Sequence, residues 1–319
     1  MSITRTALQD LFRIPVQFQD KLAMVRDSSS DQTQEQTNSA FSEKWSTLES
    51  AGSSNVEQFQ KGWLLDLYGF GTEKSLEAFL ATRTVILDAG CGLGGKSAWL
   101  ATLAPGAIVF GVDYSEAANI AAERYRDVPN LFFIRGDIAD LPFKPGVVDF
   151  ILCDQVIHHT QNPRQTFAHL SSLLSADGRF ACYVYAKKAL PRELIDDYFR
   201  QATLDLSHED LWAFSGQMTQ LGKALSDLNL TFVAPEIPVL GIKGGEYDIQ
   251  RFIYWNFLKC FYRPDWSKAE NDACNFDWYA PSNAARYTPE DIRGWVQELR
   301  LRIFFFRSEE ACHTLIVGR

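Results

Sequence analysis

A glycine-rich loop carries the strongest chemical signal in the sequence. It reads Asp88-Ala89-Gly90-Cys91-Gly92-Leu93-Gly94-Gly95 and follows a short apolar run over residues 84–88. Glycines at this spacing let backbone N–H groups approach a bound nucleotide, whose charged part sits at the N-terminus of the next helix. The pattern therefore predicts a nucleotide-type ligand, and a tight turn without a ligand is the plain alternative.

Two ligands fit this loop equally well. Gly90, Gly92 and Gly95 satisfy the G-x-G-x-x-G pattern of dinucleotide-binding folds. Asp88, together with Gly90, Gly92 and Gly94, satisfies the loop that holds S-adenosylmethionine. The polar residues further along the chain are needed to distinguish between the two ligands.

Polar residues follow the next three apolar runs and favour a nucleoside. Asp113 ends the second run about 20 residues after the loop, where a carboxylate accepts both ribose hydroxyls. Asp137 follows the third run, although a helix N-cap would also explain it. Asp154 and Gln155 follow the fourth run. Since ligands of parallel sheets bind outside the carboxyl ends of the strands, we expect these side chains to meet at one site.

The elements that position these residues alternate between strand and helix. We expect strands over residues 84–88, 107–112, 131–135, 147–153 and 179–185, and helices over 96–103, 115–125 and 166–174, with 177–178 closing the last. Ser115 is expected to be the N-cap of its helix. Alternation at intervals of about 20 residues predicts a parallel sheet with right-handed crossovers.

The flanking regions have a helical pattern and end in a hairpin. Helices are expected over residues 40–80, 191–206, 209–228 and 247–261, and hairpin strands over 301–307 and 312–317. No strand is expected from 187 to about 275, a stretch too long for a loop in a compact domain. Thr288 and Pro289 are expected to be the N-cap and first residue of a helix that runs to about residue 299.

Together, these motifs over residues 85–185 closely resemble class I S-adenosylmethionine-dependent methyltransferases, in the branch that includes ubiquinone/menaquinone methyltransferases. Residues 36–45, 275–279 and 287–290 are similar to bacterial type 11 methyltransferases, most of whose substrates are unassigned. The resemblance implies an α/β fold with a Rossmann-like sheet of seven strands, the last of them antiparallel. It divides the chain into an N-terminal helical lid (1–82), a donor-binding core (83–186), a helical substrate-cap insertion (187–286) and a final helix with hairpin (287–319).

The resemblance also implies the donor, S-adenosylmethionine, its product S-adenosylhomocysteine, and the residues that hold the donor. These are Asp88, Gly90, Gly92, Gly94, Asp113, Tyr114, Asp137, Ile138, Asp154 and Gln155. Asp113 is expected to accept the ribose hydroxyls, and Asp137 the adenine amino group. Phe41 and Trp45 are expected to close over the donor as a lid, and the polar loop at 27–36 would give that lid its mobility.

Two adjacent histidines are the best candidates for a catalytic base. Methyl transfer is an in-line displacement, so the protein mainly positions the reactants and excludes water. An oxygen, nitrogen or carbon nucleophile can also need a proton removed, which suits a histidine. His158 and His159 follow the fourth strand, and His159 is the favoured base. The plain alternative is that both bond to loop backbone or pack against the donor.

The insertion is rich in aromatic side chains, with eleven between residues 247 and 279. We expect Tyr185, Tyr254, Trp255, Trp278 and Tyr279 to bind the acceptor, and the alternative is that the aromatic residues form the core of the insertion. Acidic neighbours (Asp248, Asp265, Asp277) favour a cationic acceptor, whereas basic ones (Lys187, Lys188, Arg192, Arg251) favour a carboxylate or phosphate. Charge in the sequence therefore does not select the acceptor.

Composition narrows the class of protein. The 319 residues carry 31 basic and 40 acidic side chains, so the net charge of −9 argues against nucleic-acid binding and against an anionic membrane surface. The six cysteines include no C-x-x-C pair, so no metal site is expected. Without a signal-peptide pattern or a long apolar run, a cytoplasmic protein is expected. A small-molecule methyltransferase is favoured, with a homodimer left open; the alternatives are a protein or RNA methyltransferase and a NAD-dependent oxidoreductase.

Overall fold

The structure is a computed structural model that describes residues 8–25, 32–51 and 55–319. Of the polar loop expected at 27–36, residues 27–31 lie outside these ranges. Residues 32–36 begin helix α2 (Gln32–Ala51). Within the described ranges, every helix is too short or too polar to cross a membrane.

A nine-stranded sheet organises the chain, in the order β1-β2-β5-β4-β3-β6-β7-β11-β10. The strands are β1 (Phe18–Gln19), β2 (Leu22–Met24), β3 (Val85–Ala89), β4 (Ile108–Asp113), β5 (Leu131–Arg135), β6 (Val148–Cys153), β7 (Leu174–Tyr185), β10 (Arg302–Ser308) and β11 (Cys312–Gly318). Strands β5, β4, β3, β6 and β7 run parallel, and β11 is antiparallel to β7. The expected α/β class, parallel core and antiparallel last strand are confirmed.

The strand count differs from the expected seven because an N-terminal hairpin joins the sheet. Strand β2 pairs in parallel with β5, and β1 pairs antiparallel with β2. The segment before the core, expected to be a helical lid, therefore contains two short strands as well as helices α2 and α3. These strands are only two and three residues long, so they carry no alternating pattern; β2 pairs with β5, and β1 pairs with β2.

Alternation along the central strands places two cores on opposite faces of the sheet. Val85 and Leu87 face one core, and Ile86 between them faces the other. The first core lies under α7 (Pro163–Ser172), α12 (Pro289–Glu298) and the N-terminal segment. The second lies under α3 (Asn55–Leu67), α4 (Glu73–Leu80), α5 (Gly95–Leu103) and α6 (Ala117–Arg124). Burial on both faces explains why these strands are continuous apolar runs.

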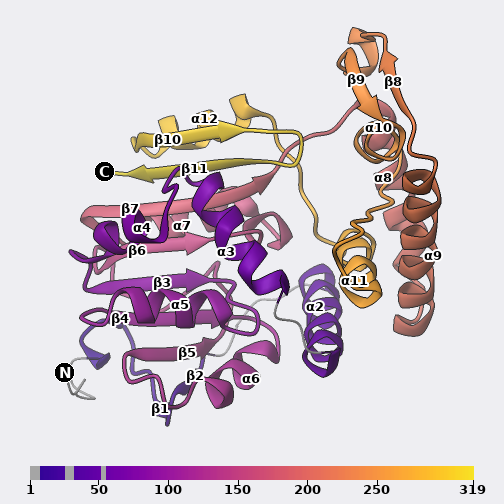
Figure 1. The fold of residues 1–319 in the computed structure, drawn as a ribbon. Coiled ribbons are helices and arrows are strands. Elements are labelled where there is room, and N and C mark those ends of the chain that lie inside the picture. The colour runs from indigo at the N-terminus through magenta and orange to yellow at the C-terminus, as the bar shows by residue number, and fades with distance from the viewer. Residues whose placement is uncertain (1–7, 26–31, 52–54) are drawn as a thin grey trace.

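Residues 190–279 form a cap beyond the carboxyl ends of the parallel strands (Figure 1). It comprises α8 (Leu190–Thr203), α9 (His208–Asp227), β8 (Thr231–Ala234), β9 (Gly245–Asp248), α10 (Ile249–Asn256) and α11 (Lys268–Tyr279). The expected absence of strands here was wrong, since β8 and β9 form a separate two-stranded sheet. Each has only four residues, and β9 reads Gly-Glu-Tyr-Asp, so neither resembles a buried strand in sequence.

Several expected boundaries shift for local reasons. Glu116, not Ser115, is the N-cap of α6. The Ser115 hydroxyl donates to Asp113 at 2.6 Å and accepts the Ala117 N–H at 3.3 Å. Strand β7 begins at Leu174 and includes the 177–178 pair that was expected to close the preceding helix. The N-cap at Thr288 is confirmed, with a capping box to Asp291.

The segment before the N-terminal hairpin is predicted to contribute substantially to stability through Phe12. Its buried ring lies 4.6 Å from the Phe143 ring and 5.8 Å from the Phe110 ring. We expect Phe12→Ala to lower the free energy of unfolding by about 3–5 kcal/mol, measured by urea denaturation. Met24→Ala, on the exposed side of β2, should change it by less than about 0.5 kcal/mol. Equal effects of the two substitutions would contradict the assigned packing.

Candidate functional site

A cavity of about 770 Å³ lies where the parallel strands end. Its floor includes Gly90, Gly92, Asp113, Tyr114, Asp137, Ile138, Asp154 and Gln155, and its roof includes Phe41, Lys44, Trp45, Trp266, Cys274 and Asp277. His159 and Tyr185 complete the wall between them. The volume suits a small-molecule site, and the floor contains eight of the ten residues expected at the donor.

The glycine loop makes the floor by adopting a backbone that other residues rarely adopt. Gly90 and Gly92 have φ of +88° and +52°. A Cβ at Gly92 would lie 2.8 Å from the Trp45 ring, and one at Gly90 would overlap Val156. These glycines therefore permit the close approach of the roof. Gly94, the N-cap of α5, does not line the cavity.

Two carboxylates are held in place on the floor. One oxygen of Asp113 accepts the Gly92 N–H at 2.8 Å, and the other accepts the N–H and hydroxyl of Ser115 at 2.9 and 2.6 Å. One oxygen of Asp137 accepts the Ala139 N–H at 2.8 Å. Fixed carboxylates beside a glycine loop fit the ribose and the amino group of a nucleoside, so the residues present fit the expected donor.

Asp154 is the centre of a buried polar group that includes a lysine the sequence analysis missed. It accepts the Tyr68 hydroxyl at 3.0 Å and forms an ion pair with Lys96. Burial opposes the charge of Lys96, but Asp154 more than offsets it, so the pKa of this lysine is raised. Gln155 next to it has φ of +66°, a strained value that recurs at functional sites. The position of Lys96 directly after the glycine loop was the available signal.

Asp88 lies beneath the glycine loop rather than on the cavity wall. Its side chain is buried and accepts the Ser97 hydroxyl at 2.6 Å. Burial raises the pKa of this carboxyl to about 6. Asp88 therefore lies under the loop, and it can act on the donor only through a bridging group.

The two histidines have different surroundings. His159 lines the cavity, and its Nδ1 lies 2.6 Å from the carbonyl oxygen of Asn283. Because a carbonyl only accepts, Nδ1 carries the proton and Nε2 keeps a lone pair. Burial lowers the pKa of His159 to about 3, so the ring is neutral at pH 7. His158 does not line the cavity; it is buried and stacks on Tyr185 with centroids 3.5 Å apart.

The roof joins two segments that are distant in sequence. Helices α2 and α11 lie side by side, and Lys44 pairs with Asp277 at 2.7 Å between them (Figure 1). Phe41 packs edge-on against His159 with centroids 4.8 Å apart. Thr37 accepts the Asn283 N–H at 3.0 Å, which links α2 to the segment that holds His159. The sequence analysis named Phe41 and Trp45 but missed Lys44, although it lies on the same helix face.

Of the five residues expected at the acceptor, the structure brings Tyr185 to this cavity. Tyr254, Trp278 and Tyr279 are buried within the cap and do not line it. Trp255 lines a second cavity of about 450 Å³, on the side of the cap that faces β10 and β11. Most of these aromatic residues therefore form the core of the insertion, as the alternative interpretation had it.

Asp88 makes a testable contribution to the pH dependence of stability. Its pKa of about 6 exceeds the usual unfolded value of about 3.9, so the folded state binds more protons between these values. The carboxyl thus favours folding below about pH 4 and loses that advantage as pH rises through 6.

We therefore expect Asp88→Asn to raise the free energy of unfolding at pH 7.5 by about 1–3 kcal/mol, with little change at pH 4. Urea denaturation at both pH values measures the difference. Asp127→Asn, the same substitution at an exposed site, is the control. A variant that is less stable than the parent at pH 7.5 would refute the assignment.

Comparison with known proteins agrees with this geometry. A family model described as a methyltransferase domain matches residues 87–182. A malonyl-[acyl-carrier protein] O-methyltransferase of Legionella pneumophila is 32% identical over 94 residues, which cover 29% of this chain and 33% of that protein. A trans-aconitate 2-methyltransferase of Deinococcus radiodurans is 32% identical over 115 residues, covering 35% of this chain and 43% of that protein.

Among solved structures, a magnesium protoporphyrin IX methyltransferase from Synechocystis with bound S-adenosylmethionine matches 92% of this chain and 100% of its own, at a TM-score of 0.46 and 17% identity. The chain spans less than half of the length of the two curated relatives described above. Residues 87–182 are nevertheless matched by one family model, and they hold the glycine loop and the floor carboxylates. Residues 87–182 are therefore a methyltransferase domain, and their glycine loop and carboxylates fit S-adenosylmethionine as the methyl donor.

Proposed function

We propose that the chain transfers a methyl group from S-adenosylmethionine to an oxygen, nitrogen or carbon nucleophile of a small-molecule metabolite. The observation that carries the proposal is the continuity of one cavity from the donor floor to His159, Tyr185 and the roof. A roofed cavity of about 770 Å³ favours a small acceptor over a protein or RNA chain. The relative named as a trans-aconitate 2-methyltransferase is consistent with such an acceptor.

In this proposal, the donor binds on the floor and the acceptor binds under the roof. Backbone at Gly90 and Gly92 admits the donor, and Asp113 accepts its ribose hydroxyls. Asp137 faces the adenine amino group with Ile138 and Tyr114 beside it. The remaining contacts come from Asp154, Gln155, Lys96 and the lid residues Phe41 and Trp45. The ion pair between Lys44 and Asp277 keeps the roof closed and excludes water from the reacting atoms.

His159 receives the acceptor's proton where the nucleophile carries one. When bound, S-adenosylmethionine supplies a sulfonium methyl group: the nucleophile–methyl bond forms, the sulfur–methyl bond breaks, and the electron pair stays on sulfur. The lone pair on His159 Nε2 accepts the proton because Nδ1–H is committed to Asn283. A pKa of about 3 makes protonation at pH 7 cost about 5 kcal/mol. The site therefore suits an acceptor that is acidic or already ionised.

Transfer of a labelled methyl group tests the proposed function. The protein is incubated with methyl-labelled S-adenosylmethionine and an extract of the producing cells, which is then divided into small-molecule and macromolecular fractions. We expect label in the small-molecule fraction, where mass spectrometry identifies the acceptor. Label in protein or RNA would instead establish a modification enzyme. Binding of NADH in place of S-adenosylhomocysteine, measured by calorimetry, would point to an oxidoreductase.

His159→Ala tests the base. With an acceptor that must lose a proton, we expect kcat to fall by about 10²-fold or more, while the Kd for S-adenosylhomocysteine changes little. His169→Gln is the matched control: this histidine lies on α7, away from the cavity, and glutamine keeps an acceptor for the Leu141 N–H. A fall of less than about tenfold for His159→Ala would assign that residue to packing rather than to proton transfer.

A further inference from the structure

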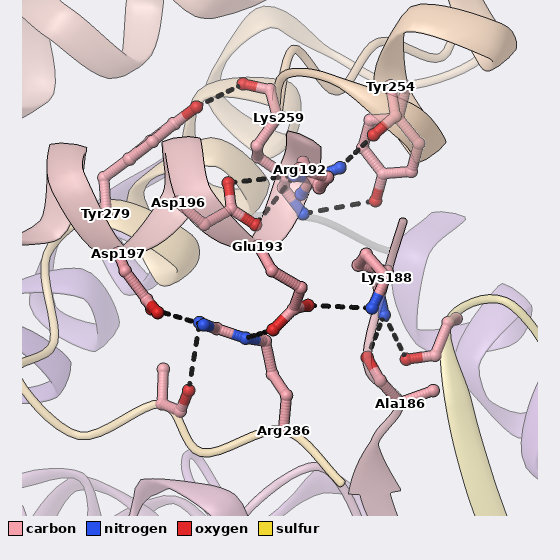
Figure 2. A network of polar contacts seen from close by, with 12 residues as sticks. Ala186, Lys188, Arg192, Glu193, Asp196, Asp197, Tyr254, Lys259, Tyr279 and Arg286 are labelled. Carbon is pink, nitrogen blue, oxygen red and sulfur yellow. Dashed lines mark hydrogen bonds and ion pairs between the residues drawn. The ribbon is translucent and has the colours of Figure 1, made fainter. Parts of the chain in front are cut away.

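Four cationic side chains surround one buried tryptophan in the cap. The charged ends of Lys188, Arg192, Arg200 and Lys259 lie 5.9, 5.0, 6.0 and 5.2 Å from the centre of the Trp278 ring. Figure 2 shows three of these four cations in the polar network of the cap. We call these five residues the Trp278 cluster.

The carboxylates close to the cluster are already engaged. Asp196 accepts from Nε of Arg192 with both oxygens, at 2.8 and 2.7 Å. Glu193 and Asp197 both pair with Arg286, outside the cluster (Figure 2). Asp196 is thus the one carboxylate, among the described residues, that pairs with a member of the cluster.

Three cations of the cluster have no carboxylate partner among the described residues. Lys188 is only half-buried, and its Nζ donates to the carbonyl oxygens of Ala186 and Ala311 at 2.7 and 3.0 Å. Lys259 and Arg200 are the buried ones.

Lys259 Nζ donates to the Tyr254 hydroxyl at 3.3 Å and to the Cys274 sulfur at 3.8 Å. Arg200 donates through Nη1 to the Pro281 carbonyl at 2.7 Å, whereas its Nη2 is buried without a partner among the described residues. Both side chains are more than nine-tenths buried.

A buried charge without a counter-ion is costly, so a protein that keeps two of them needs a reason. The Nε1–H of Trp278 is likewise buried and has no partner among the described residues. The cluster therefore combines an excess of positive charge with hydrogen-bond donors that nothing in the described chain satisfies. An anionic group from outside the chain would supply the missing counter-charge.

The cluster adjoins the main cavity across a wall one side chain thick. Cys274 and Tyr185 line the cavity on one side. On the other, Cys274 contacts Lys259, and the Tyr185 ring lies 5.0 Å from the Trp278 ring. Asp277, an acidic residue nearby on the roof, pairs with Lys44 through one of its oxygens. Lys259 and Arg200 therefore place positive charge behind this wall.

We propose that the methyl acceptor is a small organic acid whose carboxylate binds against the Tyr185–Cys274 wall, drawn there by Lys259 and Arg200. The proposal rests on the proposed function and narrows its substrate class. Lys259 and Arg200 act as positioning residues, because they attract and orient the acceptor through the wall without touching the transferred methyl group. The two cations act strongly because the cap excludes water around them.

Anion-exchange fractionation tests the substrate class. The small-molecule extract is split into a retained, anionic pool and an unretained pool, and each is incubated with the protein and methyl-labelled S-adenosylmethionine. We expect label in products formed from the retained pool. Label from the unretained pool alone would overturn the organic-acid proposal and leave the methyltransferase function standing. No label from either pool, with S-adenosylhomocysteine still bound, would overturn both.

Lys259→Met tests the role of the cluster. Initial rates against dilution of the retained pool, at saturating donor, give an apparent KM. We expect it to rise by about tenfold or more, because a charge-assisted attraction is lost. The Kd for S-adenosylhomocysteine should stay within about twofold, and the melting temperature should stay or rise, because an unpaired buried charge is removed.

Two further variants complete the test. Lys223→Met removes a surface cation of the cap that pairs with Asp227, and it should leave the apparent KM unchanged. Arg200→Gln carries the same prediction as Lys259→Met and serves if that variant fails to fold. The proposal would be refuted if Lys259→Met and Arg200→Gln, where they fold, lower the melting temperature but leave the apparent KM unchanged. The cluster would then have a structural role only.

Discussion

The parallel strands of the sheet all end at one edge, and the whole site depends on this constraint. Because the strands are parallel, the residues that follow them all lie at the same edge of the sheet. Carboxylates that are far apart in sequence therefore share one cavity floor. Asp113 and Asp154 meet there although they follow different strands. An edge of this kind is open to water, however, so a floor alone cannot protect a methyl transfer. Helices α2 and α11 form a roof that covers this edge.

The cover works because its two halves are tied to each other and to the wall. Helix α2 comes before the sheet and α11 comes from the cap, and the Lys44–Asp277 pair joins them over the cavity. Asn283 connects this roof to the wall: its N–H is bonded to α2, and its carbonyl accepts from His159. Movement of α2 would therefore disturb the histidine as well as the roof. Closure and the tautomer of the candidate base are linked through one residue.

Local signals made the core predictable, whereas the cover depends on long-range contacts. The strands around the glycine loop are apolar runs bounded by glycines, which can be recognised from the local sequence alone. The N-cap role of Thr288 likewise depends on residues close to it in sequence. The β1–β2 hairpin could not be found this way, because its strands are very short and β2 joins the sheet through the distant strand β5. Tyr254 and Trp278 were misplaced since a dense aromatic segment has the same composition whether it lines a pocket or fills a core. Lys44 and Asp277 gain their meaning only when α2 meets α11.

Charge links the two halves of the proposed reaction. In the proposed reaction the donor arrives with a positive sulfonium, while Lys259 lies behind Cys274 and Arg200 lies beside Trp278. A negatively charged acceptor would be attracted by both. Transfer removes the sulfonium charge, and the donor product then no longer attracts the acid. The attraction that assembles the reactants is thereby weakened by the reaction itself, which favours release of both products.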